Sequence, residues 1–369
     1  MRFPEFTEEW KAEQLDNIAT LSKGIGISKE QLSEDGEPCI LYGELYTKYK
    51  SEIIKQVESK TDINGSKLKR SKANDVIIPC SGETAVDIAT ARCVPFDNIL
   101  FGGDLNVISL HQYDGAFMSY QLNGKRKYDI ARVAQGVSIV HLYGEHLKAI
   151  KTYNPTLPEQ QKIAKLLSLL DDRIDTQNKI IEKLQSLIKG IAQHCIKEST
   201  SGNTYVKLGD ICQITTGKLD ANAQVDNGIY PFFTCAEQPF KIDSFAFDTE
   251  ALLISGNGVN LGYINYYKGK FNAYQRTYVL DLFSENIQYI KWALKVLLPK
   301  RIAIEKSSSN TPYIVLSTLT DLRLPIPCKS KQSFIANLMQ SLERKLSNQI
   351  AQYDSYNYLK QYLLRQMFI

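Results

Sequence analysis

The sequence predicts an α+β protein in which two similar modules alternate with two long helices. Three observations predict it: the front of a module occurs twice, the back of a module occurs twice, and each back continues as a long run with heptad periodicity. The fronts are Leu15-Asp16-Asn17-Ile18, which runs on to Gly24, and Leu208-Gly209-Asp210-Ile211, which runs on to Gly217. The two fronts are separated by a constant offset of 193 residues (208 − 15).

The backs of the two modules are separated by a smaller offset. Residues 163–174 return as residues 335–346, and Pro155 returns as Pro327, at an offset of 172 (335 − 163). The first module therefore contains 21 more residues than the second between its ends (193 − 172). Constant ends around different interiors are expected of a molecule that recognises two different halves of one extended target.

The composition is that of an ordinary soluble globular protein. The 369 residues are 43% hydrophobic and 23% charged, which suits two or three cores. The first six residues lack the apolar core of a signal peptide, and no stretch approaches about 20 uninterrupted apolar residues, so a cytoplasmic protein without a membrane segment is expected. Seven cysteines without a Cys-x-x-Cys pair, and four histidines without ligand spacing, predict reduced, mostly buried thiols and no metal site.

Each module is expected to mix short strands with turns. Apolar and β-branched runs predict strands at residues 75–82 and 106–110 of the first module, and at residues 251–258, 263–267 and 277–282 of the second.

Helical signal inside the modules is confined to short stretches such as residues 288–295. Gly256, Gly258 and Gly262 do not have the spacing of a nucleotide-binding loop, and they predict a turn between two strands.

The first long helix is predicted to open at Pro158 and Glu159, and residues 198–204 are expected to form a turn or linker after it. The second is expected to open with Ser330 as its N-cap. Apolar residues alternate in steps of four and three along both helices, which is the pattern of a coiled-coil seam. The seam residues are Ile163, Leu167, Leu170, Ile174, Gln177, Ile181 and Leu184 in the first helix, and Ile335, Met339, Leu342, Leu346 and Gln349 in the second.

The seam contains one polar position that recurs at the repeat offset, Gln177 and Gln349 (349 − 177 is again 172). A buried amide in a seam lowers stability and fixes register and partner choice. The alternative is that both glutamines lie at the edge of the seam in water. The resulting domain boundaries are 1–154 and 199–327 for the modules, with 155–198 and 328–369 for the helices.

Basic residues cluster locally in both modules, although the net charge of +4 is too small to indicate a nucleic-acid partner by itself. Neighbouring aromatic and amide residues, including Tyr266 and Asn272, suit contacts to phosphates and base edges. A plain solvated surface explains each cluster taken alone. The candidate DNA-binding residues are Lys67, Lys69, Arg70, Lys72, Lys125, Arg126 and Lys127 in the first module, and Lys268, Lys270 and Arg276 in the second.

No catalytic signature is present at a spacing that the sequence alone reveals. There is no G-x-x-x-x-G-K-[ST] motif, nucleophile arrangement or carboxylate pair. Asn154-Pro155 is followed by Thr156 and Leu157, so it is not the Asn-Pro-Pro-aromatic element of amino-methylating enzymes. We therefore expect a chain without catalytic residues and without a cofactor of its own.

The order of these parts resembles the specificity subunit of type I restriction–modification systems. Arg2-Phe3-Pro4-Glu5-Phe6, with Trp10 and Leu15, is similar to the start of many such subunits. Leu157-Pro158-Glu159-Gln160-Gln161-Lys162-Ile163-Ala164 is similar to their P-x-x-E-Q-x-x-I-A opening of a central helix. The second opening, at residues 329–336, keeps only Gln332, Ile335 and Ala336.

The resemblance implies two α/β target-recognition domains separated by two long helices that pack as an antiparallel coiled coil. Each domain would recognise one half of a split double-stranded DNA target, and the helices would set the gap and scaffold two modification subunits. Methylation with S-adenosylmethionine, and cleavage with ATP and Mg, would belong to separate modification and restriction subunits. Two alternatives remain open: a coiled-coil scaffold that does not bind DNA, and a fragment of a fused methyltransferase and specificity enzyme.

Overall fold

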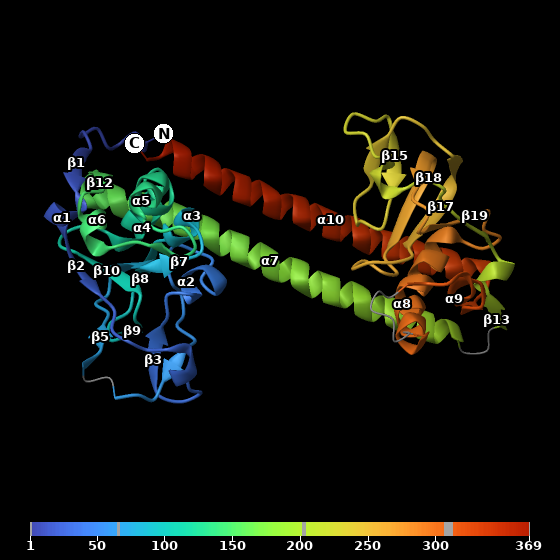
Figure 1. Cartoon of the computed structure of the whole chain (residues 1–369), viewed down its shortest axis with the longest axis horizontal. Coiled ribbons are helices and arrows are strands. Elements are labelled where there is room, and N and C mark those ends of the chain that lie inside the picture. The colour runs from blue at the N-terminus through green and yellow to red at the C-terminus, as the bar shows by residue number, and fades with distance from the viewer. Residues whose placement is uncertain (1, 65–66, 201–203, 306–312, 369) are drawn as a thin grey trace. The chain divides into compact units, whose positions relative to one another are not determined.

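A computed structural model describes residues 2–64, 67–200, 204–305 and 313–368. The chain forms two compact units, one made of Met1–Lys179 and Ala351–Ile369 and the other of Ile180–Ile350. We call these unit 1 and unit 2. The two long helices are α7 (Leu157–Thr200) and α10 (Lys329–Gln366), and each contributes residues to both units (Figure 1).

The first module, in unit 1, is built on an antiparallel sheet of four strands in the order β2, β10, β6 and β8 (Figure 1). The strands of this sheet are β2 (Ala19–Lys23), β10 (Leu105–Leu110), β6 (Asp75–Pro79) and β8 (Arg92–Val94). The other strands of this module are β1 (Lys11–Gln14), β3 (Glu37–Ile40), β4 (Lys60–Thr61), β5 (Lys69–Arg70), β7 (Ser81–Gly82), β9 (Leu100–Phe101), β11 (Val140–His141) and β12 (Lys151–Asn154). The helices are α1 (Leu15–Ile18), η1 (Lys29–Gln31), α2 (Glu44–Thr47), α3 (Ala85–Ile88), α4 (Gly115–Asn123), α5 (Lys127–Val133) and α6 (Gly144–Lys148).

The second module, in unit 2, is built on a six-stranded sheet in the order β14, β19, β17, β18, β15 and β16. Its strands are β14 (Gln213–Thr216), β19 (Thr277–Asp281), β17 (Phe247–Ser255), β18 (Ile264–Ala273), β15 (Tyr230–Phe233) and β16 (Phe240–Ile242), and β13 (Thr204–Lys207) pairs separately with β20 (Arg323–Ile326). The helices are η3 (Leu208–Asp210), η4 (Ala221–Ala223), α8 (Ile287–Glu305) and α9 (Leu316–Thr320).

The repeat seen in the sequence is a repeat of strand register. In the first module Ile108 of β10 pairs with Leu21 of β2, and in the second Leu280 of β19 pairs with Ile214 of β14. The two pairs are related by the offsets of 172 (280 − 108) and 193 (214 − 21). The parallel pairing of β3 with β9 recurs in the same way between β15 and β18. The prediction of two similar α+β modules is therefore confirmed.

Most of the additional residues of the first module lie between two matched strand positions. Pro38 pairs with Lys60, and its counterpart Pro231 pairs with Lys241. The intervals are 22 residues (60 − 38) and 10 residues (241 − 231), so 12 of the 21 extra residues fall here. This segment contains α2 and contributes Leu45 and Ile54 to a core of its own module.

The predicted strands are buried on both faces in the first module. Val76 and Ile78 belong to one apolar cluster, whereas Ile77 between them belongs to another, as the two-residue period of a strand requires. Burial on both faces explains why residues 76–78 are continuously apolar in the sequence.

The predicted seam packs inside each unit. In unit 1 Ile163 and Leu167 of α7 cluster with Leu363 and Met367 of α10, which lies beside it (Figure 1). In unit 2 later residues of α7, including Leu184 and Ile188, share a cluster with early residues of α10, including Ile335 and Met339. Because early residues of one helix meet late residues of the other, the two helices run antiparallel.

The seam amides differ in burial. Gln177 is 5% exposed, so its side chain lies inside, while Gln349 is half-buried. The alternative that both glutamines lie at the edge of the seam in water is therefore wrong for Gln177.

Three details differ from the sequence-based expectation. The helix expected at residues 288–295 is α8, which spans 19 residues and contains Pro299. Its residues 289–294 are all buried, and burial on every side removes the helical period from the sequence. Residues 198–200 are helical, because α7 continues to Thr200, and the rest of the predicted linker up to residue 203 lies outside the described residues. Ser330 lies within the first turn of α10 and is not its N-cap, since that helix begins at Lys329.

The recurrent glycines at the end of the module fronts have a steric role. A Cβ on Gly217 would overlap the carbonyl oxygen of Ala273 and lie 2.6 Å from that of Tyr274, and a Cβ on Gly24 would overlap the carbonyl oxygen of Gly102. Backbone atoms cannot move aside as a flexible side chain can. Only glycine allows these strands to approach so closely.

We predict that Gly217→Ala lowers the free energy of unfolding of unit 2 by about 1–3 kcal/mol. The matched control is Gly190→Ala in α7, where the added Cβ would meet no atom within 4 Å apart from its chain neighbours and the adjacent backbone of its own helix. That change is expected to stabilise by about 0.5–1 kcal/mol, because alanine is the better helix former. Urea denaturation of both variants checks the prediction, and equal effects would show that the close approach is not sterically required.

Candidate nucleic-acid interface

The two modules present equivalent turns with different side chains. Gly102-Gly103-Asp104 joins β9 to β10, and Tyr274-Gln275-Arg276 joins β18 to β19 at the same offset of 172 (276 − 104). The carbonyl oxygen of Asp104 accepts a hydrogen bond from the Cys80 amide at 2.7 Å, and that of Arg276 accepts one from the Gly256 amide at 2.8 Å. The two turns thus share a strand register and a backbone hydrogen bond, and an aspartate in one module replaces an arginine in the other. Their backbones differ at this residue, because the φ angle of Asp104 is 59°, in the left-handed region, and that of Arg276 is not positive.

Polar groups from three loops surround this turn in the second module. The Cys235 thiol donates to Asn257 Oδ1 at 3.0 Å, and Asn260 Nδ2 donates to the Cys235 carbonyl oxygen at 3.0 Å. The side chains of Gln275 and Arg276 are exposed, and Arg276 makes no ion pair with any described residue. We call the five residues Cys235, Asn257, Asn260, Gln275 and Arg276 the recognition edge.

Gly258 and Gly262 shape the turn between β17 and β18, which confirms the predicted strand-to-strand turn. Their φ angles are 79° and 80°, in the left-handed region that glycine adopts at no steric cost. Val259, which follows Gly258 in the loop, is fully exposed. This loop holds Asn257 and Asn260 in place at the recognition edge.

The candidate lysines of the second module lie on β18. Lys268 and Lys270 are exposed, with Lys268 Nζ 3.6 Å from Glu250 Oε2 and Lys270 Nζ 4.6 Å from the centroid of the Phe245 ring. Both can reach a phosphate by rotating their side chains. Asn272 cannot contact a base, because it is buried and its amide donates to the carbonyl oxygen of Ser244 at 3.4 Å.

The first basic cluster of the first module is partly neutralised within the chain. Arg70 of β5 forms a two-pronged pair with Glu37, with Nη1–Oε2 and Nη2–Oε1 distances of 2.6 and 3.0 Å. This pair lowers the pKa of the Glu37 carboxyl and raises that of Arg70. Lys67 and Lys72 are exposed and Lys69 is half-buried, so Lys67 and Lys72 are the cations of this cluster best placed to bind a phosphate.

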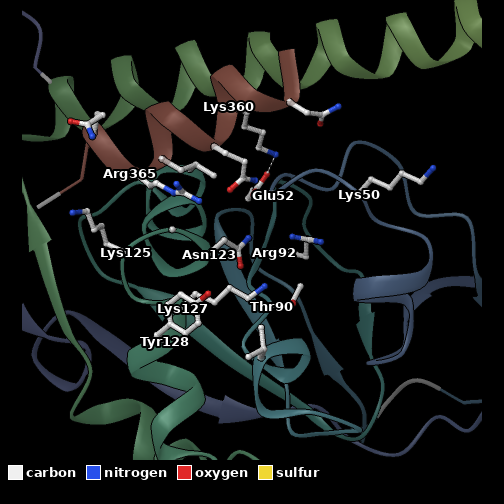
Figure 2. A pocket seen from close by; sticks show the side chains of 16 residues that line it. Lys50, Glu52, Thr90, Arg92, Asn123, Lys125, Lys127, Tyr128, Lys360 and Arg365 are labelled. Atoms are coloured by element: carbon white, nitrogen blue, oxygen red, sulfur yellow. Dashed lines mark hydrogen bonds and ion pairs between the residues drawn. The ribbon is translucent and has the colours of Figure 1, made fainter. Parts of the chain in front are cut away.

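The residues of the second basic cluster, Lys125, Arg126 and Lys127, lie in two different environments. Arg126 packs over the Tyr153 ring at 5.2 Å and pairs with Asp129 at 3.1 Å, so it supports the start of α5. Lys125 and Lys127 instead line a cavity of about 740 Å³ (Figure 2). The sequence predicted these two lysines, but not the other basic residues of this cavity, Lys50, Arg92, Lys360 and Arg365.

Four further observations bear on function. Within the described ranges no group of three His, Cys, Asp or Glu side chains is placed to hold a metal ion. The same ranges contain no helix that is long and apolar enough to cross a bilayer. The seven cysteines are free, but fewer are buried than expected: Cys39, Cys80 and Cys93 are buried, Cys195, Cys212 and Cys235 are half-buried and Cys328 is exposed. Burial raises the pKa of the Cys80 thiol to about 11, which makes it a poor nucleophile near neutral pH.

Comparison with known proteins identifies the same architecture. The family model of the type I restriction modification DNA specificity domain matches twice, at residues 7–186 and 200–353. A specificity subunit of the type I restriction enzyme EcoDI from Escherichia coli is 44% identical over 137 residues, which are 37% of this chain and 30% of that protein. A specificity subunit of the enzyme MjaVIII from Methanocaldococcus jannaschii is 23% identical over 91% of this chain and 86% of that protein.

The first relatives are matched over only part of their length, 30% for the Escherichia coli protein and 59% for the MjaIX specificity subunit of Methanocaldococcus jannaschii. Among solved structures, the type I restriction–modification S subunit of M. genitalium superposes with a TM-score of 0.69 over 100% of this chain and 97% of that one, at 19% identity. A second structure, from work on the complex assembly and conformational transition of the type I restriction–modification system, superposes with a TM-score of 0.59 at 16% identity. The match covers 98% of this chain and 97% of that one. These likenesses establish the fold.

Proposed function

This chain belongs to the family of type I restriction–modification DNA specificity proteins, and from that premise we propose that it recognises a bipartite double-stranded DNA target, one half-site per module. It carries no catalytic role in this proposal. Separate modification subunits would methylate the DNA with S-adenosylmethionine, and a restriction subunit would cleave it with ATP and Mg. The recognition step is the part that this chain's own residues would perform.

The observation that carries the proposal is the shared strand register and turn hydrogen bond with exchanged side chains. Both modules hold a turn at the same place in the same strand register, but one turn ends in Asp104 and the other in Arg276. In the major groove an aspartate accepts from cytosine N4, while an arginine donates to guanine O6 and N7. Two copies of one scaffold would thus recognise different base pairs in the two half-sites.

Phosphate contacts would supply the affinity that does not depend on sequence. Lys67 and Lys72 in the first module, and Lys268 and Lys270 in the second, are exposed cations near the sheets that carry the turns. Each phosphate contact releases counterions, so binding is expected to weaken steeply as salt is added.

The long helices suit the attachment of the partner subunits. The seam residues such as Ile163 and Leu167 are buried inside the chain and are not accessible to a partner. Apolar residues on other faces of α7 are exposed instead: Leu166 and Leu169 in unit 1, and Ile180 and Leu187 in unit 2. We assign this exposed set to contacts with the modification subunits.

Methylation mapping tests the recognition proposal. The full chain is co-expressed with a cognate modification subunit, and the host DNA is sequenced for modified bases. We expect a motif of two defined halves around a fixed gap, and we expect Arg276→Ala to relax or abolish recognition in one half only. Loss of one two-pronged base contact corresponds to about 1–3 kcal/mol of discrimination.

The matched control for this experiment is Arg323→Ala, an exposed arginine of β20 outside the recognition edge, which should leave the motif unchanged. A continuous motif would refute the bipartite target. Absence of methylation from a complex that assembles fully would favour the alternative of a coiled-coil scaffold that does not bind DNA. Relaxation in both halves would show that Arg276 acts through the fold as a whole.

A further inference from the structure

A basic pocket lies in unit 1 between the first module and the C-terminal part of α10. We use this name for the cavity of about 740 Å³ lined by Lys50, Arg92, Lys125, Lys127, Lys360 and Arg365. Its walls are the segment before β4, the start of α5, β8 and α10. Figure 2 shows Lys127 and Arg92 extending into the same space, with Lys360 turned toward Glu52 on the opposite wall. A cavity of this size is typical of a site for a nucleotide-sized ligand.

The charges of the basic pocket are not balanced by the chain. Glu52 is its one acidic lining residue, and Glu52 already pairs with Lys360 at 2.6 Å, as does the buried Asp171 at 2.7 Å. At longer range Asp87 and Glu52 act on Lys127, and Glu52 and Asp171 act on Arg92. The other five cations, Lys50, Arg92, Lys125, Lys127 and Arg365, form no ion pair with a carboxylate in the part of the chain that the structure describes.

Arg92 is held rigidly at the back of the basic pocket. It is 8% exposed, and its Nε and Nη1 donate to the carbonyl oxygens of Tyr49 and Ala91 at 3.1 and 3.2 Å. Burial lowers the pKa of its guanidinium. Because two of its nitrogens are fixed by the backbone, the remaining nitrogen has a defined direction, which is the arrangement that preorganised anion sites use.

Lys127 faces Arg92, and burial disfavours the charged form of both side chains. Burial first, and then the positive charge of Arg92, lower the pKa of the Lys127 ammonium. Two like charges in a shielded place destabilise the empty site, and an anion between them would remove that cost. Tyr128, at the mouth, is 65% exposed and offers its ring for stacking on a base.

We propose that the basic pocket binds the phosphate groups of a phosphorylated ligand. Two sources share this chemistry: a free nucleotide that enters the cavity, and a phosphodiester of DNA bound to the first module. The first source is independent of the proposed function, whereas the second rests on it. In both cases Arg92 and Lys127 contact the phosphate oxygens, while Lys125 and Arg365 add charge at the rim.

Binding to the full chain is measured by isothermal titration with pyrophosphate and with ATP as probes, and with a duplex DNA of arbitrary sequence across a salt series. The main variant is Lys127→Met, which removes a charge that burial already disfavours, so the variant should fold with at least the stability of the parent. The control is Lys29→Met, an exposed lysine of η1 outside the cavity.

For a free ligand we expect one binding site per chain, weakened at least about tenfold by Lys127→Met and unchanged by Lys29→Met. For a DNA phosphate we expect no small-ligand binding, and a salt dependence of DNA affinity whose slope falls by about one in Lys127→Met alone. The proposal is overturned if Lys127→Met alters neither small-ligand binding nor the DNA salt slope. Methylation mapping with Arg276→Ala is a separate measurement, so that outcome would leave the recognition proposal standing.

Discussion

Replacement of Lys360 by methionine is expected to lower the free energy of unfolding of unit 1 by about 3–5 kcal/mol. The Lys360 ammonium lies 2.6 Å from Glu52 and 2.7 Å from Asp171, and the three side chains are 11%, 8% and 4% exposed. The Tyr120 hydroxyl donates to the other oxygen of Asp171 at 2.7 Å. Removal of this ammonium would leave two carboxylates buried together without the cation that pairs with them directly, and Arg92 would act on them only at longer range.

The loss should depend on pH in a defined direction. Burial raises the pKa of Asp171 above that of an unfolded aspartate, so folding disfavours its ionised form, and its contribution to stability improves as the pH falls through the raised pKa. Without Lys360 this effect grows. The difference between parent and variant should therefore be largest near neutral pH and should shrink toward acid, and urea denaturation at several pH values measures it.

Two variants control the Lys360 experiment. Lys345→Met removes an exposed lysine from the same helix and is expected to change stability by no more than about 0.5 kcal/mol. The triple variant Lys360→Met, Glu52→Gln, Asp171→Asn removes every charge of the cluster and should recover most of the loss, since a neutral buried group needs no counter-charge. A loss that persists in the triple variant, or that grows toward acid, would mean that Lys360 acts through packing and not through charge.

The helix seam and the Lys360 cluster together show which features of the structure can be predicted from the sequence. The seam was predictable because Ile163 and Leu167 are spaced by a helical turn, and that period is local. The repeat was predictable because two copies can be compared directly. Lys360 interrupts the expected apolar pattern of the second seam, but its partner Glu52 is 308 residues away and no spacing relates them.

The basic residues show that clustering along the chain does not by itself identify a binding site. Arg70 was a candidate for DNA binding by its neighbours in sequence, but sheet pairing places it against Glu37, which neutralises it. Arg92 was not a candidate, because it lies alone between Ala91 and Cys93, and only the tertiary fold carries it to Lys127. A cluster along the chain thus indicates local charge, whereas a binding site depends on charge that remains uncompensated after folding.

Gln332→Leu is expected to lower the free energy of unfolding of unit 2 by about 2–4 kcal/mol. Gln332 is fully buried in the first turn of α10, where its Oε1 accepts from the Asn286 amide at 3.1 Å and its Nε2 donates to the Pro327 carbonyl oxygen at 2.9 Å. Nε2 also donates to Glu285 at 2.6 Å. Asn286 in turn caps α8 by accepting from the Tyr289 amide at 3.1 Å. Leucine would leave the Asn286 amide and the Pro327 carbonyl oxygen without these partners, while Glu285 would keep its pair with Lys329.

The first module contains the same arrangement, which makes the prediction testable twice. Gln160 accepts from the Asp114 amide at 2.9 Å and donates to the Pro155 carbonyl oxygen at 2.8 Å, and Asp114 caps α4 by accepting from the Phe117 amide. Gln160→Leu should therefore destabilise unit 1 as Gln332→Leu destabilises unit 2. Hydrogen exchange locates each effect, and the exposed neighbours Gln161→Leu and Gln340→Leu should change neither unit.

This repeated contact explains which residues the second helix opening keeps. Of the first opening it retains the glutamine, the isoleucine and the alanine, and Gln332, Ile335 and Ala336 are 0%, 2% and 4% exposed. The second opening does not keep the glutamate. Glu159 is buried and forms a two-pronged pair with Arg2. Its counterpart Lys331 instead donates from Nζ to the carbonyl oxygen of Glu198.

The residues that attach a module to its helix are thus the same in both copies. Glu159 differs because its partner Arg2 belongs to the first copy only. If exchange accelerates around Asn286 in Gln160→Leu as much as in Gln332→Leu, the two contacts are not independent and each module is not attached by its own glutamine.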